Sequence, residues 1–233
     1  MRFFIITILL LSASEGYTQR ISSHRYLEAG VIMGFNNYSG DVAESVVELS
    51  ETTIGFGVFA RYHFSSHFAL KTQFYTANIS GTDANARDPE LKARSLQFKS
   101  NLLEIVLAGE WNILNVKPLE RNGLRKFRIV PYLSLGIGAV FMHPTVKYFG
   151  PPNEFNKQVP YPLPENGLFK KALMIPVGGG FRSQITDRIT LGIEGGWRPV
   201  FSDYLDGVSL NGNPKYKDWY YTAIATLSFA LTQ

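Results

Sequence analysis

The sequence predicts an all-β fold, namely an eight-stranded antiparallel transmembrane β-barrel of the outer-membrane type. Three observations predict it: apolar residues alternate with glycine and charged residues, the strand candidates are even in number, and long connections alternate with short ones. The 233 residues are 45% hydrophobic and 14% aromatic, and they include 21 Gly and 12 Pro. This composition excludes disorder and favours short strands and turns over long helices.

The chain begins with a segment that has the features of a secretory signal peptide. Arg2 precedes an apolar stretch from Phe3 to Leu11, and small and polar residues follow it. The stretch is less than half as long as a membrane-spanning helix, so a transmembrane anchor is the weaker alternative. We expect residues 1–18 to be a signal peptide and residues 19–233 to form one outer-membrane barrel domain.

The alternation that predicts a barrel is clearest between Thr52 and Phe64. The even positions from Ile54 onward are apolar, whereas the odd positions include Gly55 and Arg61. The solvent face of a soluble β-sandwich would instead be rich in Lys, Glu, Thr and Ser. A closed barrel with lipid outside and a tightly packed lumen accounts for both faces.

Four strands are expected in the first half of the chain. The second of them is the alternating run described above, and the turn Ser65–Ser66 joins it to the third. The four strands are residues 25–36, 53–64, 67–78 and 95–113.

The fourth strand is irregular. Its apolar residues occupy even positions at Leu96 and Phe98 but odd positions from Leu103 onward. A β-bulge between Lys99 and Leu102 would restore the register. The alternative is that residues 95–100 form a loop and only the later part is a strand.

Four more strands are expected in the second half of the chain. In the fifth strand, Leu135 and Ile137 oppose Gly136 and Gly138, and the sixth and seventh repeat this pattern. Phe229 lies near the carboxyl terminus, as expected for a final strand that closes the sheet. The four strands are residues 128–141, 169–185, 189–201 and 219–231.

The connections between these strands support the same topology. The amino terminus is placed in the periplasm, so the tight turns Ser65–Ser66 and Thr186–Arg188 and the intermediate connection of residues 114–127 lie on the periplasmic side. Aromatic residues near the strand ends would form the interfacial girdles. The long outer connections are residues 37–52, 79–94, 142–168 and 202–218, and the aromatic residues are Tyr62, Trp111, Trp197, Trp219, Tyr220 and Tyr221.

The lumen of an eight-stranded barrel has room only for side chains, which disfavours an open solute channel. Strand parity points four acidic and four basic side chains inward, and inward glycines leave space for the long arginines. Because buried charges must be paired, the balanced set predicts an ion-pair network that plugs the lumen. The set is Glu28, Arg61, Lys71, Glu104, Glu110, Arg182, Glu194 and Arg198.

No catalytic or metal-binding constellation stands out in the sequence. The four His have no paired metal spacing, and the chain has no nucleophile turn and no P-loop. His143, Ser202 and Asp203 are the best set for a lipid-modifying barrel enzyme, which is the weaker interpretation. Asp203 and Asp206 lack the further ligands of a calcium loop. We expect no enzyme activity, no cofactor and no metal.

Charge and cysteine content exclude further classes. The net charge is +4, but Lys and Arg are scattered and form no run that would track a nucleic acid, so none is expected as a partner. The chain has no Cys, which excludes a disulfide framework, a thiolate metal site and a Cys nucleophile.

Several segments resemble a Bacteroidota outer-membrane family that contains PorG, a component of the type IX secretion and gliding machinery. The sharpest part is the strand that bears Glu194, followed by Arg198, Phe201 and the run from Asp203 to Asp206. The resembling segments cover most of the mature chain: Tyr26–Val42, Ser95–Leu114, Pro131–Pro144, Ile175–Arg182 and Leu191–Ser209.

The resemblance implies a non-enzymatic anchor that holds periplasmic ring proteins of the PorK and PorN kind at the cell outer membrane. It also implies a family motif at the outer rim, carried by Asp203, Tyr204 and Asp206. The chain departs from the family pattern at Gly207, where a second Asp is frequent, and at Tyr38–Val42, where an aromatic-Gly-Asp-Leu turn is frequent.

Outer-membrane lipid and the ring proteins are therefore the expected partners. The fourth connection, residues 114–127, is the expected docking surface for the ring. Alternatively, this connection is a solvated basic turn without a partner. A competing function is surface binding or adhesion through the proline-rich outer loop of residues 144–164. The basic residues of the fourth connection are Lys117, Arg121, Arg125, Lys126 and Arg128.

Overall fold

The computed structural model describes nine strands and one short 3-10 helix. The described residues are 25–39, 51–85, 89, 92, 95–114, 129–148, 170–186, 188–202, 205 and 218–231. The strands are β1 (Tyr26–Ser39), β2 (Thr53–His63), β3 (Phe68–Thr82), β4 (Leu96–Asn112), β5 (Ile129–Tyr148), β6 (Lys170–Met174), β7 (Val177–Gln184), β8 (Ile189–Pro199) and β9 (Trp219–Ala230), and the helix is η2 (Asp83–Asn85).

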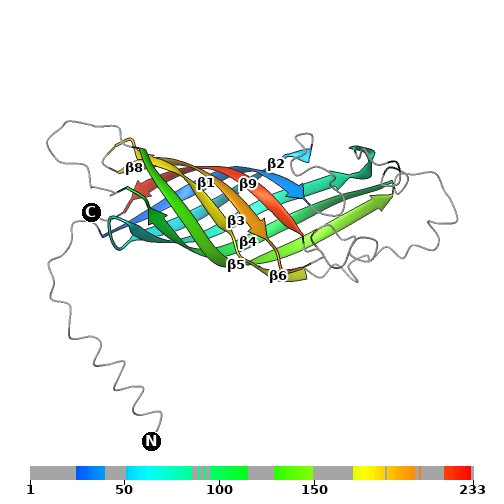
Figure 1. Cartoon of the computed structure of the whole chain (residues 1–233), viewed down its shortest axis with the longest axis horizontal. Helices are drawn as coiled ribbons and strands as arrows, with labels where there is room; N and C mark the ends of the chain where they lie inside the picture. Colours follow the sequence, from blue (N-terminus) through cyan, green and yellow to red (C-terminus); the bar gives the residue numbers. More distant parts are fainter. Residues whose placement is uncertain are drawn as a thin grey trace, which may run out of the picture.

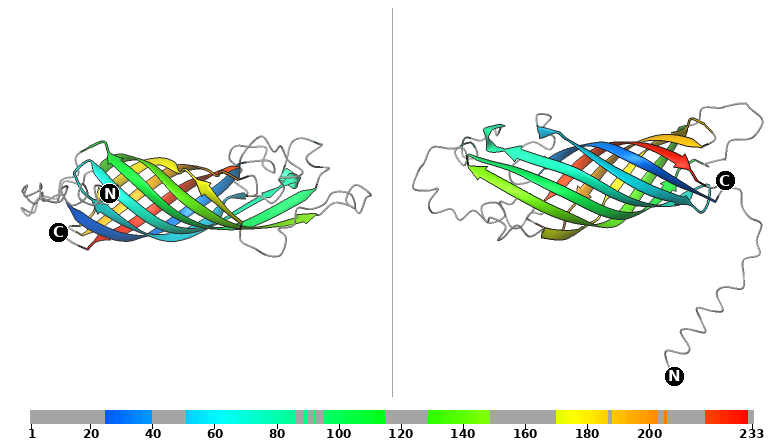
Figure 2. Two further views of the ribbon diagram at one scale, coloured as in Figure 1. Left: turned by 90° about the horizontal axis from the view of Figure 1, so that it is seen from below. Right: turned by 180° about the vertical axis from the view of Figure 1, so that it is seen from behind.

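The strands form one antiparallel sheet that closes on itself. Their order is β4-β3-β2-β1-β9-β8-β7-β5-β6, and an additional pairing between β4 and β5 completes the ring. The views in Figure 1 and Figure 2 agree on a tilted cylinder in which β1 begins and β9 ends at the same end. The predicted fold class, a closed antiparallel barrel of the outer-membrane type, is confirmed.

β6 and β7 are two halves of one pass through the barrel wall. Leu135 pairs with Val177 and Gly138 pairs with Met174, so both halves share one register with β5. Pro176 interrupts the ladder because proline has no N–H, while its carbonyl accepts a hydrogen bond from the Gly136 N–H at 2.9 Å. The nine strands therefore make the eight passes that the sequence predicts.

β4 is continuous, which corrects the prediction made for it. Its register with β3 and its register with β5 are both unbroken from one end to the other. Its even positions are buried along its whole length and its odd positions point outward. The expected bulge between Lys99 and Leu102 and the alternative loop over residues 95–100 are both wrong.

The change of apolar parity in β4 has a different cause, because the polarity of the barrel wall reverses near one end. In most of the wall, apolar side chains face outward. At the beginning of β4, however, the pattern is reversed. Leu96 and Phe98 face inward and are buried, whereas Lys99 and Asn101 face outward and are exposed. A strand that leaves lipid for water shows this reversal, because its apolar side must then face a protein core.

β3, β4 and β5 form a projection beyond the other strands, on the right in Figure 1. β3 continues to Thr82 and β5 to Tyr148, so both end later than the predicted boundaries of 78 and 141. The predicted third and fifth connections are correspondingly shorter.

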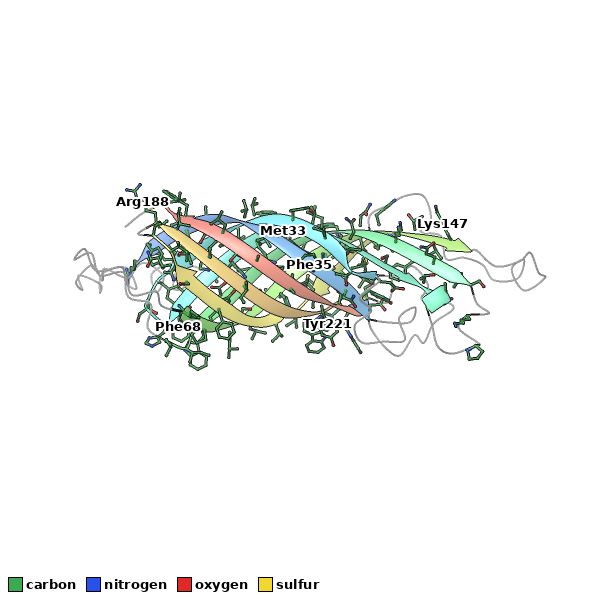
Figure 3. All side chains as sticks on the ribbon, turned by 90° about the horizontal axis from the view of Figure 1, so that it is seen from above. Met33, Phe35, Phe68, Lys147, Arg188 and Tyr221 are labelled. Atoms are coloured by element: carbon green, nitrogen blue, oxygen red, sulfur yellow. The ribbon has the colours of Figure 1, made fainter. Side chains whose placement is uncertain are left out.

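The outer wall of the cylinder carries a band of large exposed apolar side chains. Leu135, Ile137 and Ile193 are 61%, 59% and 61% exposed. Met33, Phe35 and Phe68 point away from the barrel in Figure 3. An apolar surface that encircles a molecule is far larger than a soluble monomer leaves in water, so this band faces lipid.

Aromatic residues lie at both ends of the band, with one exception to the prediction. Tyr62 and Trp111 are exposed at the end with the short turns, and Trp197 and Trp219 pack edge to face at the other end, 6.5 Å between ring centroids. Tyr220, expected in the girdle, is instead 0% exposed and lies inside the barrel, because its even position in β9 shares the parity of the buried face. Among the described residues, no helix is both long and apolar enough to cross a bilayer.

Candidate functional site

All eight charged residues predicted to face inward lie buried in the barrel. Six strands contribute them: β1, β2 and β3 one each, β4 two, β7 one and β8 two. The strand alternation explains their positions, since each one occupies the face opposite to the lipid-facing residues. The eight are Glu28, Arg61, Lys71, Glu104, Glu110, Arg182, Glu194 and Arg198.

Three cations share the carboxylate of Glu110 and form the centre of a lower cluster, on the side of the short turns. Arg61 Nε lies 2.8 Å and Arg182 Nη2 lies 2.6 Å from Glu110 Oε2. Lys71 Nζ lies 3.3 Å from Glu110 Oε1. Arg182 Nη2 donates a short charge-assisted hydrogen bond to Glu110 Oε2, and Arg61 Nη2 donates a longer one to Glu110 Oε1 at 3.3 Å. With the Lys71 ion pair, Glu110 thus links three strands other than its own.

Two further carboxylates extend the lower cluster. Arg61 Nη1 donates to Glu28 Oε2 at 2.8 Å, and the Ser228 hydroxyl donates to the same oxygen at 3.0 Å. Lys71 donates to Glu194 Oε2 at 2.7 Å, and the Tyr132 hydroxyl donates to it at 2.8 Å. The cluster balances the acids Glu28, Glu110 and Glu194 against the bases Arg61, Lys71 and Arg182.

An upper cluster is built around the ion pair of Glu104 and Arg198. The Tyr220 hydroxyl donates to Glu104 Oε1 at 2.6 Å, and Arg198 Nε donates to the Thr222 hydroxyl at 3.1 Å. The Arg198 guanidinium also lies over the ring of Tyr75, 5.6 Å from its centroid. One acid and one base are balanced here as well.

A small cavity of about 10 Å³ lies between the two clusters. A space of this size holds about one water molecule and no organic substrate. Gly178 fits its wall closely, because a Cβ there would lie 2.9 Å from the Gly195 carbonyl oxygen and 3.0 Å from Ser134 Oγ. Polar residues that line the cavity include Lys71, Gln73, Ser134, Glu194 and Arg198.

An apolar group closes the lumen toward the projecting end. Tyr38, Phe98 and Leu205 are buried there, and the rings of Tyr38 and Phe98 meet edge to face at 4.8 Å. Asp218 holds this group in place, because its carboxylate accepts hydrogen bonds from the Tyr38 hydroxyl at 3.0 Å and from the Leu205 N–H at 3.1 Å. Side chains therefore fill the described lumen around the small cavity between the two clusters.

Two sets of predicted residues lie outside the described residues. These are the outer-rim motif Asp203, Tyr204 and Asp206, and the basic residues of the fourth connection, Lys117, Arg121, Arg125, Lys126 and Arg128.

The best hydrolytic set is only partly described. His143 lies on β5 and Ser202 follows β8, and β7 separates these two strands in the ring. Asp203 lies outside the described residues. Within the described ranges, no group of three His, Cys, Asp or Glu could hold a metal ion.

Polar partners of the network were missed by the sequence analysis. Tyr75, Tyr132, Tyr220 and Ser228 all donate hydrogen bonds to buried acceptors in the lumen. His63 Nε2 lies 3.4 Å from Glu28 Oε1, and its ring stacks on Tyr26 at 4.2 Å. Strand parity is the sequence signal that places these residues in the lumen, because each lies on the inward face of its strand.

Comparison with solved structures gives the same architecture. Neisserial surface protein A (NspA) is 10% identical, with 87% of this chain and 96% of that chain covered and a TM-score of 0.51. Ail, the attachment invasion locus protein of Yersinia pestis, is 8% identical, with 91% and 100% covered and a TM-score of 0.46. The similarity to NspA agrees with the lipid-facing band and with the predicted outer-membrane location.

Comparison of sequences gives one family. The profile of the family described as "Domain of unknown function (DUF6089)" matches residues 1–233. No curated protein matches the chain.

Proposed function

The chain belongs to the DUF6089 family, and we propose that it is a non-enzymatic outer-membrane barrel that serves as a structural anchor. In this function the barrel wall holds the protein in lipid and the parts outside the membrane bind partners. The interior contributes rigidity and no chemistry.

The packed lumen is the observation that supports this proposal most strongly. An enzyme or a channel needs space for a substrate or a solute, and the cavity between the two clusters has a volume of only about 10 Å³. The charged groups nearest to it already pair with one another, as Lys71 does with Glu194 and Arg198 with Glu104. An anchor needs only a stable wall and exposed ends.

The proposed partners are periplasmic ring proteins of the PorK and PorN kind. This part of the proposal rests on the resemblance to the PorG-containing family. The proposed docking surface is the basic fourth connection, because five basic residues in a short segment attract an acidic partner surface. The residues are Lys117, Arg121, Arg125, Lys126 and Arg128.

Cross-linking in cells followed by purification of the barrel tests this partner assignment. Ring proteins should be recovered with the wild-type chain and lost when the five basic residues are replaced by Glu. The matched control is the variant Lys99→Glu, Lys147→Glu, Lys171→Glu, which reverses exposed charges on the projecting strands and should keep normal recovery. Equal recovery with wild type and the five-residue variant would remove the fourth connection as the docking surface.

A second candidate function is surface binding or adhesion at the outer end. The projection of β3, β4 and β5 beyond the lipid-facing band favours it, because a sheet that stands in water offers a rigid base for binding loops. Deletion of residues 149–168 separates the two functions. Loss of binding to host or neighbouring cells with intact ring recovery would favour adhesion, and loss of neither activity would argue against it.

A further inference from the structure

The outward side of the projecting strands carries three exposed lysines. They are Lys99 on β4, Lys147 on β5 and Lys171 on β6. Among the described residues, no carboxylate faces outward in this part of β3, β4, β5 or β6. The other outward polar side chains are His143 and uncharged groups such as Asn78, Asn101 and Thr145. We call Lys99, Lys147 and Lys171 the lysine face.

The lysine face continues directly from the lipid-facing band. Leu103 pairs with Phe141, and Phe141 pairs with Lys171 on the next strand. Leu173, 60% exposed, lies two residues beyond Lys171 on the same strand. The first lysine of the face is thus a direct neighbour of side chains in contact with lipid.

Lys171 and Lys99 lie near the layer of lipid head groups, and Lys147 lies further out on the same side of the barrel. Outward residues on one strand are about 7 Å apart, so Lys171 lies about 7 Å from Leu173 along β6 and Lys99 lies about 13 Å from Leu103 along β4. In a barrel whose strands tilt by about 40°, these separations place Lys171 roughly 5 Å and Lys99 roughly 10 Å above the apolar band, and Lys147, six residues beyond Phe141 on β5, roughly 15 Å above it. The head-group layer occupies roughly the first 5 to 7 Å above the hydrocarbon core, and a lysine stem can extend back along the protein surface toward it.

The remainder of the barrel rim has a different composition. β8 ends and β9 begins near Trp197, Trp219 and Tyr221, the interfacial aromatic residues. In Figure 3, Lys147 stands on the projecting strands, whereas Arg188 lies at the opposite end of the barrel. The lysine face therefore occupies one sector of the outer rim, formed by β4, β5 and β6.

We propose that the lysine face binds the phosphate groups of lipids in the outer leaflet, whose acyl chains lie on Leu103, Phe141 and Leu173. Two observations support this occupant: the face is continuous with a surface already in contact with lipid, and its charge is complementary to phosphate with no described carboxylate to oppose it. Lysine contributes as a point charge, so the face selects lipids by their phosphate charge and position.

This inference goes beyond the anchor function and does not depend on it. Loss of ring-protein recovery after reversal of the fourth connection leaves the lysine face unaffected. Failure of lipid binding at the lysine face likewise leaves the anchor function intact.

Native mass spectrometry of the full barrel released from lipid nanodiscs tests the proposal. The probe is bisphosphorylated lipid A, compared with the same lipid after removal of its phosphates. The wild-type barrel should retain the phosphorylated lipid, and Lys99→Glu, Lys147→Glu, Lys171→Glu should reduce retention by roughly tenfold or more, since each basic residue at a membrane surface contributes about a factor of five.

Two controls make the result specific. The triple Lys→Arg variant preserves charge and should retain the phosphorylated lipid as the wild type does, and the triple Lys→Gln variant should lose it without introducing repulsion. Free inorganic phosphate should not displace the lipid, because the acyl chains add apolar contacts.

Three results would overturn the proposal. They are equal retention by the wild type and the Lys→Gln variant, equal retention of the dephosphorylated lipid, and displacement by inorganic phosphate alone. Loss of binding to an acidic polysaccharide or protein in the Lys→Gln variant, with lipid retention unchanged, would assign the face to that other partner instead.

Discussion

Glu110 is the residue on which the lower cluster of the lumen depends most. Its carboxylate is in contact with Arg61, Lys71 and Arg182, and all four side chains are buried. If the Glu110 carboxylate is neutralised, the three cations of the lower cluster are left with only two buried carboxylates, those of Glu28 and Glu194. Breaking a buried charge pair in this way usually costs more than the pair contributes, because the uncompensated charge stays buried.

The substitution Glu110→Gln should therefore destabilise the folded barrel by about 3 kcal/mol or more. The measurement is urea unfolding in detergent micelles, followed by tryptophan fluorescence and by the gel shift between folded and heat-denatured forms. The control is Gln97→Ala on the outward side of β4, which should change the free energy of unfolding by less than about 0.5 kcal/mol. A Glu110→Gln barrel as stable as the control would show that the cluster does not stabilise the fold.

The positions of single residues also show how far the sequence predicts the interior of the barrel. Strand parity located the eight charged residues of the two lumen clusters, because a two-residue period leaves no freedom once one face is assigned to lipid. Glu51, Asp83 and Asp218 are also buried, but they lie outside the predicted strands, where no parity applies. Tyr220 was placed in the aromatic girdle because tyrosine at a strand end suggests an interface, although its parity puts it beside Glu104. Parity is the stronger signal when the two disagree.

At the scale of strands, the close approach of β7 and β8 depends on inward glycine. A Cβ on Gly180 would lie 2.8 Å from the Cα of Glu194, closer than real side chains approach a backbone. Gly195 on β8 points to the lipid side, and a Cβ there would meet nothing within 4 Å. Gly180 is therefore tightly enclosed and Gly195 is open to the outside, although both lie in the pairing of β7 with β8.

Gly180→Ala should destabilise the barrel by about 1 to 3 kcal/mol, because the strands must separate to admit the methyl group. Gly195→Ala should be neutral or stabilising by up to about 1 kcal/mol, because it restricts the unfolded chain at no steric cost. The comparison uses the same urea titration for both variants. Equal effects of the two substitutions would contradict the packing described for this pair of strands.

β4 explains where strand prediction failed. The shift of its apolar residues from even to odd positions has two possible origins, an inserted residue or a change of surroundings. The expected bulge assumed that lipid lies outside the whole strand, whereas the upper end of β4 lies in water with Phe98 facing a protein core. The sequence pattern alone does not mark the height at which lipid ends.

At the scale of the whole molecule, the barrel has an apolar band outside and charge inside. The even number of passes and the alternating connection lengths predicted this closure. The sequences of the long connections show no two-residue alternation of apolar residues, so strand parity predicts nothing about their structure. Whether the band faces lipid can be tested on one strand, because β5 crosses from Ile137 in the band to Thr145 beyond it.

Ile137→Arg should destabilise the barrel in lipid bilayers by about 2 to 4 kcal/mol, the cost of arginine near the bilayer midplane. Thr145→Arg, on the outward side of the same strand, should cost less than about 1 kcal/mol. Reversible unfolding in guanidinium, monitored by tryptophan fluorescence in bilayers, gives both values. An Ile137→Arg barrel that unfolds like the Thr145→Arg barrel would place the two positions in the same solvent.

The most direct test of the lipid-facing band is spin-label accessibility, which the chain permits because it contains no Cys. Single Cys residues at Ile137 and Thr145 are labelled, and the barrel is reconstituted in bilayers. The account predicts high accessibility to oxygen at 137 and high accessibility to a water-soluble nickel complex at 145. A label at 137 that is reached by the nickel complex, or by neither reagent, would contradict it.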